Sequence, residues 1–358
     1  MDSDMQQMRQ VRSQSSDYIG IDLGTSNTYI YTPEHGVCVR EPSAIAYEKK
    51  SGRVIAAGSE AKKMIDKTPA EIAALCPLSE GVVSDFDFAV MMLRDFVKKA
   101  GRGMFASRPR AVVCLPCGVS EVEKRAVEDV CLEAGMKSVS LIEEPMAAAI
   151  GAGLPVMSGR GSMIVNIGGG TTEIAVVVNG GIANYTSSKV SGTTFDDALA
   201  AYIKREFNVA ISRGSAETVK IIAGSANVRT DRGIVDVRGR NISTGLPAEI
   251  NLYSQETREA YADTVSSLVE AIRYTVENTP PELCGDICDS GIALSGGGAL
   301  LPGLEFTVGE RTRQKVYVAK RPQECVINGI AEIIDRKELR PLLEGEKFDT
   351  GVTVNVID

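Results

Sequence analysis

Residues 163–178 read Met163-Ile164-Val165-Asn166-Ile167-Gly168-Gly169-Gly170-Thr171-Thr172-Glu173-Ile174-Ala175-Val176-Val177-Val178. Two apolar, β-branched runs flank three glycines and two threonines, which predicts a β-hairpin whose tight turn has almost no side chains. Glycines in such a turn let backbone N–H groups approach a ligand closely, and successive N–H groups form a concave anion site. Taken alone, the pattern also fits an ordinary hairpin.

A second stretch, Tyr18 to Tyr31, repeats this layout of an apolar strand, a glycine turn with small polar residues, and a second strand. Two related turns in one chain suggest two similar halves that face one another and hold a polyphosphate between them. The corresponding positions are Asp22, Gly24 and Thr28 in the first stretch, and Asn166, Gly168 and Thr172 in the second.

A third glycine turn, Ser295 to Gly298, follows the apolar strand 291–294, and its backbone is expected to pass over a flat heterocycle. Through these three turns and the residues around them, the chain resembles the actin, hexokinase and DnaK-type chaperone ATPase superfamily, and within it the MreB family of bacterial actins. The similarity runs from about Tyr18 to about Glu332, in the order of that family. The motifs that carry it are residues 20–25, 141–151, 167–173 and 295–298, with further similar text at 121–127, 237–240 and 279–283.

The resemblance implies an α/β, actin-like ATPase fold of two similar halves around a nucleotide cleft. Each half is then a mixed sheet with helices and carries a smaller inserted subdomain. The implied divisions are a leader 1–16, subdomain IA (17–35, 78–145 and 320–343), subdomain IB (36–77), subdomain IIA (146–187 and 254–319), subdomain IIB (188–253) and an acidic tail 344–358.

The resemblance also implies a site for ATP or ADP with Mg²⁺. Asp22 and Asn166 occupy the metal positions, Asp22 acting through waters because Mg²⁺ keeps most of its hydration. Glu144 orients or deprotonates the attacking water, Thr171 helps place the water or the γ-phosphate, and Glu217 with Lys220 contacts ribose and purine. The nucleotide-binding positions are Gly24, Thr25, Ser26, Asn27, Gly168, Gly169, Gly170, Thr171, Gly192, Glu217, Lys220, Gly296, Gly297 and Gly298.

One site residue departs from the family, which has Asp where this chain has Asn166. Asparagine keeps the shape and one acceptor oxygen but lacks the negative charge. We therefore expect nucleotide binding to survive, and hydrolysis to be slower than in a relative that carries Asp.

Composition is ordinary for a globular protein, with 44% hydrophobic and 24% charged residues among 358, a length that favours two domains. The net charge of −8 gives no electrostatic reason to expect nucleic-acid binding. Eight cysteines include the pairs Cys114/Cys117 and Cys284/Cys288, but the only histidine is His35, so free thiols are favoured over a zinc site.

Two segments raise the question of a membrane, although no apolar run reaches the roughly 20 residues that span a bilayer. The leader 1–16 has a thin apolar stripe typical of a membrane-surface helix, while its polar composition favours disorder. Met104 and Phe105 lie in a glycine-flanked loop with arginines nearby. The resemblance implies that this loop dips into the inner leaflet, and the alternative is a loop folded on its own core.

The resemblance implies a slow ATPase that assembles head to tail into membrane-associated filaments and directs cell shape and cell-wall synthesis. Its expected partners are other copies of itself, the inner membrane surface and the cell-wall elongation machinery, and its expected location is the cytoplasm, peripheral to the membrane. The alternatives are a scaffold of the same fold with weak or no hydrolysis, which Asn166 favours, and an actin that positions plasmids or organelles. A DnaK-like chaperone would need a further substrate-binding domain, and a sugar or acetate kinase would need a catalytic Asp in a substrate pocket.

Overall fold

The computed structural model describes residues 17–101, 108–343 and 355–357. The predicted leader, the Met104–Phe105 loop and residues 344–354 and 358 of the predicted tail lie outside these ranges. The chain divides into two units. The first unit is Met1–Ser158, Val177–Ile182 and Glu324–Val352, and the second is Gly159–Val176, Ala183–Gln323 and Thr353–Asp358.

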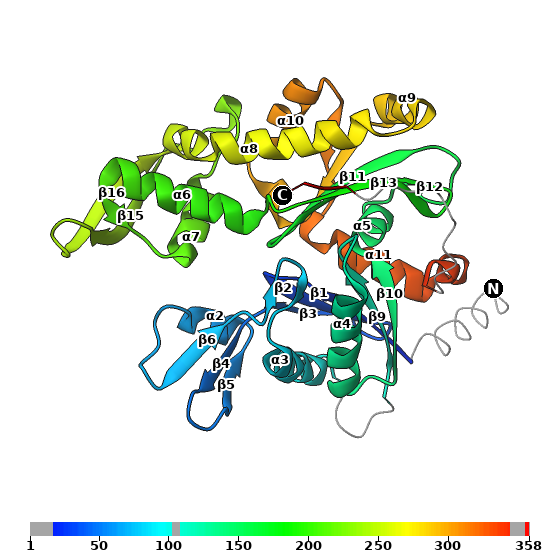
Figure 1. Ribbon diagram of the computed structural model, residues 1–358, viewed down its shortest axis with the longest axis horizontal. Helices are drawn as coiled ribbons and strands as arrows, with labels where there is room; N and C mark the ends of the chain where they lie inside the picture. Colours follow the sequence, from blue (N-terminus) through cyan, green and yellow to red (C-terminus); the bar gives the residue numbers. More distant parts are fainter. Residues whose placement is uncertain (1–16, 102–107, 344–354, 358) are drawn as a thin grey trace. The chain divides into compact units, whose positions relative to one another are not determined.

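The first unit is built on a five-stranded sheet with the order β10-β9-β1-β2-β3 (Figure 1). β1 pairs antiparallel with β2 and parallel with β9, and β9 pairs parallel with β10. The strands are β1 (Tyr18–Leu23), β2 (Asn27–Thr32), β3 (Gly36–Pro42), β9 (Arg110–Leu115) and β10 (Ser138–Glu143).

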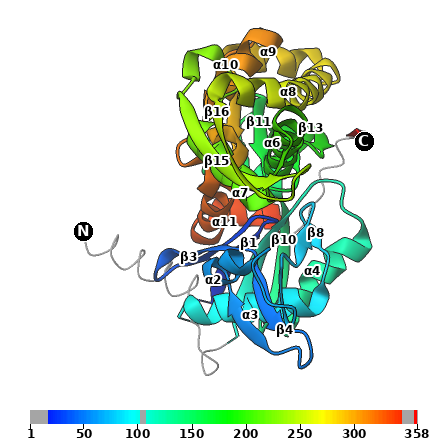
Figure 2. The same cartoon turned by 90° about the vertical axis from the view of Figure 1, so that its left-hand side faces the viewer.

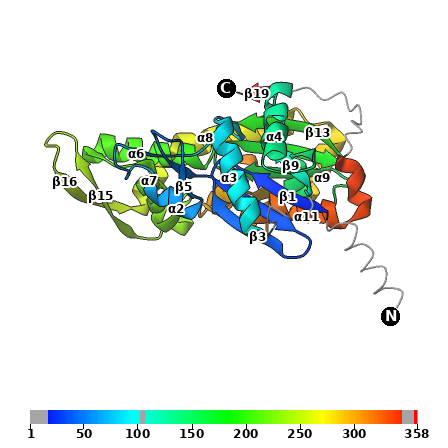
Figure 3. The same cartoon turned by 90° about the horizontal axis from the view of Figure 1, so that it is seen from below.

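Helices cover both faces of this sheet. Ile19 and Ile21 of β1 share a core with α3 (Phe86–Lys99) and α4 (Glu121–Glu133), which lie side by side in Figure 3. Gly20, between them, faces the other way, because the side chains of a strand alternate between its faces. A Cβ atom at Gly20 would lie 2.7 Å from Cγ2 of Ile330 in α11 (Cys325–Asp335).

The helices α5 (Glu144–Gly151) and α11 pack against one another through glycines. A Cβ atom at Gly151 would overlap the carbonyl oxygen of Cys325, and one at Gly329 would overlap the carbonyl oxygen of Ala147. The two backbones therefore approach so closely that neither position has room for a side chain.

The second unit is built on a six-stranded sheet with the order β18-β17-β11-β12-β13-β19. β11 pairs parallel with β17, and β17 pairs parallel with β18. The strands are β11 (Ser162–Ile167), β12 (Thr172–Val178), β13 (Gly181–Ser188), β17 (Ile292–Ser295), β18 (Val316–Val318) and β19 (Asn355–Ile357). Its helices are α6 (Gly192–Phe207), α7 (Arg213–Ala223), α8 (Ser254–Glu277), α9 (Pro281–Ser290) and α10 (Leu304–Thr312).

The two large sheets share one topology. The order β10-β9-β1-β2-β3 of the first matches β18-β17-β11-β12-β13 of the second, strand for strand. In each sheet a helix joins the last two parallel strands, α4 between β9 and β10, and α10 between β17 and β18. The repeat predicted from the two glycine turns therefore extends to all five strands of the first sheet and to five of the six strands of the second.

Each unit also carries a small three-stranded sheet. It follows β3 in the first unit, and it follows β13 and α6 in the second. In the first unit it has the order β5-β4-β6, with α2 (Ser59–Met64) packed on it, and β7 (Leu78–Ser79) and β8 (Val82–Val83) follow as a separate pair. In the second it has the order β14-β15-β16, and Figure 2 shows β15 and β16 running side by side. Their strands are β4 (Ile45–Glu48), β5 (Val54–Ala57), β6 (Ile72–Leu75), β14 (Val209–Ala210), β15 (Ile234–Asn241) and β16 (Pro247–Tyr253).

Some element boundaries differ from those that the sequence suggests. The apolar spacing of residues 83–99 predicts a helix from Val83, but α3 begins at Phe86, because Val83 pairs in β8 and the side chain of Asp85 caps the helix by accepting from the Phe88 N–H. The sequence predicts a loop over residues 279–282, but α9 begins within that range at Pro281, since proline is favoured in a first helical turn. The tail contains a strand, β19, which pairs with β13.

Candidate functional site

The first glycine turn joins β1 to β2 in the first unit. A Cβ atom at Gly24 would lie 2.8 Å from the Asn27 carbonyl oxygen, so the turn excludes a side chain there. Ser43, which follows β3, donates its hydroxyl to the Gly24 carbonyl at 2.6 Å and its N–H to the Ser26 carbonyl at 3.0 Å. The N–H groups of Thr25 and Ser26 have no acceptor among the described residues, and buried or half-buried N–H groups need one.

The predicted metal residue Asp22 is buried at the end of β1, directly before this turn. Burial raises the pKa of its carboxyl group from 3.8 to about 7, and a hydrogen bond from the Cys114 thiol, at 3.6 Å, opposes the shift. Burial likewise raises the pKa of Cys114, and the charges of Asp22 and Glu144 add to that effect. The structure thus brings Asp22, Cys114 and Glu144 together.

Glu144 is the first residue of α5, with Pro145 directly after it. The sequence predicts a turn at residues 143–145 and a helix from Met146, but the helix begins two residues earlier, at Glu144. Proline at the second position of the helix explains the difference, because its fixed φ and missing N–H suit a first turn. The half-buried Glu144 is therefore held by a helix end rather than by a loop.

The second glycine turn joins β11 to β12 and repeats the geometry of the first. A Cβ atom at Gly168 would lie 2.9 Å from the Thr171 carbonyl oxygen, as at Gly24. The first N–H groups of α6 fix the turn, since Gly192 donates to the Gly168 carbonyl at 2.9 Å and Thr193 to the Gly169 carbonyl at 3.1 Å. The N–H groups of Gly169 and Gly170 have no acceptor within the described part of the chain.

Asn166 is buried at the position that matches Asp22. Its side-chain oxygen Oδ1 accepts a hydrogen bond of 2.8 Å from the Ser295 hydroxyl at the end of β17. The remaining acceptor oxygen of this residue is thus already engaged by a neighbouring strand. Ser295 was part of the third glycine motif, but its contact with Asn166 joins residues 129 positions apart and left no signal in the sequence.

Lys220 in α7 is held by two partners that the Glu217–Lys220 spacing did not predict. Its Nζ lies 2.8 Å from Oδ1 of Asp196 and donates to the Gly192 carbonyl at 2.8 Å. Burial raises the pKa of Asp196 to about 6, and the Lys220 charge opposes this shift. Lys220 is therefore fixed beside the second glycine turn, with its charge balanced by a buried carboxylate.

The third glycine turn follows β17 and lies against the end of β11. Gly296 has a φ of 80° and donates its N–H to the Pro322 carbonyl at 2.8 Å. A Cβ atom at Gly296 would overlap the carbonyl oxygen of Ile167, and one at Gly298 would overlap the Ile167 side chain. Gly297 between them is exposed. In the second unit the structure therefore brings together the Gly168–Thr171 turn, Gly192, Lys220 and the third turn.

The predicted site residues fall into two groups, one in each unit. The first unit holds Asp22, Gly24, Thr25, Ser26, Asn27 and Glu144, and the second holds Asn166, Gly168 to Thr171, Gly192, Glu217, Lys220 and Gly296 to Gly298. Within the described residues, no three His, Cys, Asp or Glu side chains cluster as a metal site. All eight cysteines are free thiols.

Comparisons of the sequence with known proteins all match members of the MreB/Mbl family. A family profile described as MreB/Mbl protein matches residues 16–340. The chain is 40% identical over 324 residues to the cell shape-determining protein Mbl of Bacillus subtilis (strain 168), covering 90% of this chain and 97% of the relative. It is 41% identical over 327 residues to the cell shape-determining protein MreB of Escherichia coli (strain K12), covering 90% and 94%.

Among solved structures, the chain is similar to the crystal structure of MreB 5 of Spiroplasma citri bound to AMPPNP. The TM-score is 0.86 at 34% sequence identity, and the match covers 91% of this chain and 98% of that one. The predicted α/β fold of actin-like type, with two similar halves, is confirmed.

Proposed function

The chain belongs to the MreB/Mbl family, and from that membership we propose that it is an ATP-binding cytoskeletal protein that assembles into filaments and directs cell shape. The observation that carries the proposal is the pair of glycine turns with matching geometry, Gly24 in one unit and Gly168 in the other. The AMPPNP bound to MreB 5 of Spiroplasma citri supports a nucleotide as the ligand.

The backbone supports phosphate binding at both turns. Thr25 and Ser26 in the first turn, and Gly169 and Gly170 in the second, have N–H groups without an acceptor among the described residues. Successive N–H groups of this kind form an anion site. We assign the phosphates to these groups, together with Asn27 and Thr171. Glu217, Lys220 and Gly192 are assigned to the ribose side, and Gly296 to Gly298 to the base.

The donor set near Asp22 fits a magnesium ion held mainly by phosphates and waters. In such sites Mg²⁺ usually binds one or two carboxylates together with phosphates and waters, and Asp22 is the buried carboxylate beside the first turn. When bound, the ion would neutralise charge on the transferred phosphoryl group. Its charge would also favour the ionised form of Asp22, whose pKa burial has raised to about 7.

For hydrolysis, Glu144 is assigned to orient the attacking water, and Thr171 to place the water or the γ-phosphate. Asn166 has the shape of the family's aspartate but no negative charge, and its Oδ1 accepts a hydrogen bond from the Ser295 hydroxyl. We therefore propose that the chain is a slow ATPase. This residue also favours the second candidate, a filament-forming scaffold of the same fold that binds nucleotide without hydrolysing it.

We further propose that the chain has four subdomains, IA, IB, IIA and IIB, with the boundaries that the family resemblance implies. We also propose that copies of the chain assemble head to tail. The filaments would lie in the cytoplasm on the inner membrane surface, with the cell-wall elongation machinery as partner. The two small three-stranded sheets support the division into subdomains. In the described part of the chain, no helix has the length and apolar character needed to cross a bilayer.

Sedimentation of the full chain with ATP, AMPPNP, ADP or no nucleotide tests this proposal, with phosphate release measured in the same samples. We expect pelleting with ATP and AMPPNP and slow phosphate release with ATP. Pelleting with ATP but no phosphate release would select the scaffold.

Gly168→Val, which places atoms against the Thr171 carbonyl, should lose binding of a fluorescent ATP analogue, whereas Gly214→Ala on the exposed start of α7 should retain it. Equal binding by both variants would contradict the site.

A further inference from the structure

One face of α9 carries two cysteines one helical turn apart. Cys284 is half-buried and Cys288 is exposed, and both are free thiols within the helix Pro281–Ser290. Residues four positions apart on a helix are neighbours, with Cβ atoms about 5–6 Å from one another. Burial raises the pKa of Cys284, and the charge of Cys288 adds to that effect, as expected for sulfur atoms that lie close together.

The two thiols differ in what holds them. The Cys284 thiol donates hydrogen bonds to the carbonyl oxygens of Val276 and Thr279, at 3.3 Å and 3.4 Å, and is thereby fixed against the end of α8. The Cys288 thiol makes no hydrogen bond with another described residue. Between them is Gly285, where a Cβ atom would meet nothing within 4 Å. One sulfur atom is therefore held in place, and the other is open to solvent.

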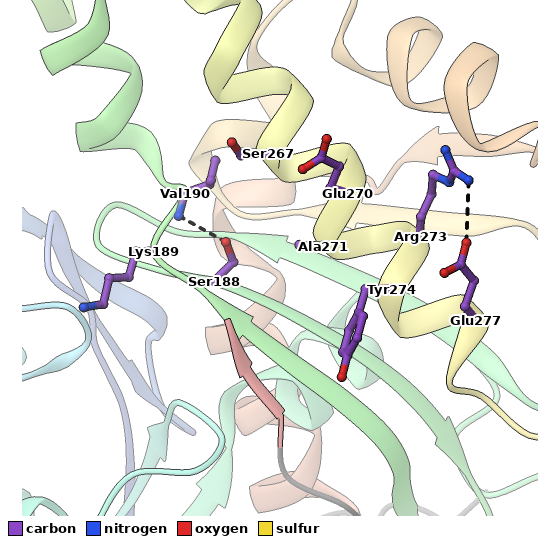
Figure 4. A pocket seen from close by; sticks show the side chains of 9 residues that line it. All are labelled: Ser188, Lys189, Val190, Ser267, Glu270, Ala271, Arg273, Tyr274 and Glu277. Carbon is purple, nitrogen blue, oxygen red and sulfur yellow. Dashed lines mark hydrogen bonds and ion pairs between the residues drawn. The ribbon is translucent and has the colours of Figure 1, made fainter. Parts of the chain in front are cut away.

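Three carboxylates on α9 and at the end of α8 are paired with arginines. Asp286 and Asp289 lie 3.5 Å and 3.1 Å from nitrogen atoms of Arg160. Glu277, which lines a pocket of about 550 Å³ beside α8 (Figure 4), lies 3.6 Å from Arg273. None of these oxygen donors can bind a cation without the loss of an ion pair, whereas the two sulfur atoms are not paired with any charge.

The spacing and the number of ligands exclude two ordinary roles for a cysteine pair. A disulfide needs Cβ atoms about 3.5–4.5 Å apart, so the helical turn would have to contract before Cys284 and Cys288 could form one. A structural zinc ion needs four ligands, and no third His, Cys, Asp or Glu of the described chain joins the pair in a metal-binding group. The pair is too widely spaced for the first role and has too few ligands for the second.

A soft ion with two ligands fits this arrangement. With metal–sulfur distances of about 2.3 Å, as in zinc thiolates, two sulfur atoms on opposite sides of an ion lie up to about 4.6 Å apart. Side chains whose Cβ atoms are about 5–6 Å apart reach that separation without a change in the helix. Thiolates select Cu(I) among the soft ions of biology. We propose that Cys284 and Cys288 form a two-coordinate site for Cu(I) on the surface of α9.

Binding at this site changes the junction of α8 and α9. Two S–H bonds are replaced by two metal–sulfur bonds and two protons are released to solvent, with no change in oxidation state. As a thiolate, Cys284 no longer donates to the carbonyl oxygens of Val276 and Thr279. The junction itself stays closed, because Asn184 holds it from within by donating to the Thr275 carbonyl at 2.9 Å and to the Thr279 hydroxyl at 3.3 Å.

Anaerobic titration of the full chain with Cu(I), in competition with a chromophoric Cu(I) chelator, tests the site. We expect the parent protein to bind one ion tightly per chain. Cys284→Ser and Cys288→Ser should each weaken this binding by about 100-fold or more, because a lost ligand costs at least as much as a lost outer-shell partner. A serine hydroxyl at position 284 can still donate to the same carbonyl oxygens, so the fold is kept. Unchanged affinity in either variant would overturn the proposal.

Two further variants are matched controls. Cys76→Ser removes another exposed cysteine, one with no second cysteine within four positions, and should bind Cu(I) as the parent does. Cys288→Ser/Asp289→Cys keeps two thiols in α9 but moves one of them about 100° around the helix, so it should bind no better than Cys288→Ser. Tight binding by this double variant would overturn the assigned geometry.

X-ray absorption at the copper edge gives an independent measurement on the loaded parent protein. The proposal requires two sulfur neighbours for each ion and one ion for each chain. Three or more sulfur neighbours, or one ion for every two chains, would mean that the ion bridges copies or binds elsewhere, and either result would overturn the site.

Discussion

The Ser295 hydroxyl donates a 2.8 Å hydrogen bond to Oδ1 of Asn166, the residue that stands where the first unit has Asp22. The two glycine turns are thus alike in backbone and unlike in charge. Asn166→Asp places a carboxylate beside the same hydroxyl, which can donate to it without moving. We expect phosphate release per filament subunit to rise by about tenfold or more, since one water-polarising group contributes at least that much. Release is measured with the parent protein and with Ser295→Ala as control, and an unchanged rate in Asn166→Asp would contradict the assigned role.

The close crossing of α5 and α11 makes its two glycines sensitive to substitution. Gly329→Ala places a methyl group on the Ala147 carbonyl, and Gly151→Ala places one on the Cys325 carbonyl. Each should lower the free energy of unfolding by about 3 kcal/mol or more, because both obstacles are backbone atoms. Urea unfolding followed by circular dichroism measures the effect. The control is Gly285→Ala in α9, where a Cβ atom meets nothing within 4 Å, and this variant should be unchanged or more stable. A Gly329→Ala protein as stable as the control would refute the close crossing.

The ion pair of Lys220 with Asp196 gives a prediction that separates stability from binding. Lys220→Met leaves a buried carboxylate without its cation and should cost about 2 kcal/mol of stability. The double variant Lys220→Met/Asp196→Asn should recover most of that loss, whereas the exposed control Lys204→Met should change little. If Lys220 also contacts the nucleotide, the double variant will still bind a fluorescent ATP analogue more weakly than the parent. Full recovery of both stability and binding would leave Lys220 with a structural role alone.

The raised pKa of Asp22 predicts how stability depends on pH. Its folded value of about 7 exceeds its ordinary 3.8, so the folded state holds the proton more tightly than the unfolded state. This contribution to stability is full below the ordinary value and is lost as the pH rises towards 7, with a slope of up to about 1.4 kcal/mol per pH unit. Asp22→Asn removes the titrating carboxyl group and with it this pH-dependent contribution to stability. Without nucleotide or divalent ions, the variant should therefore gain stability relative to the parent between about pH 4.5 and about pH 7.5. A stability difference that does not vary with pH would contradict the burial of a protonated carboxyl group.

Local patterns in the sequence predicted the local parts of this structure well. The two glycine hairpins form as expected. The spacing of Ser120 and Glu123 predicts the start of a helix, and α4 begins directly after Ser120, whose N–H donates a hydrogen bond to the Glu123 carboxylate in a capping box. These features depend on residues a few positions apart, and such spacings are visible in one sequence. The start of α3 was predicted three residues early, because Val83 continues the apolar pattern of the helix while pairing in a two-residue strand.

The contacts that complete the candidate site could not be predicted in this way. Cys114 reaches Asp22, Ser43 reaches Gly24, and Ser295 reaches Asn166 across 92, 19 and 129 positions. Each partner is a small residue whose role depends on which strands become neighbours. The strand β19 was missed for the same reason, since its pairing with β13 depends on an edge that exists only in the folded sheet.

The topology of the first unit has a consequence for synthesis on the ribosome. The five strands of its sheet are complete by Glu143, yet the face of β1 that contains Gly20 is covered by α11, which begins at Cys325. A nascent chain that has emerged only as far as the second unit therefore exposes an apolar sheet face. The unit translated first cannot finish folding until α11 has left the exit tunnel, so premature termination anywhere in the second unit yields a product for chaperones or proteases rather than a stable half-protein.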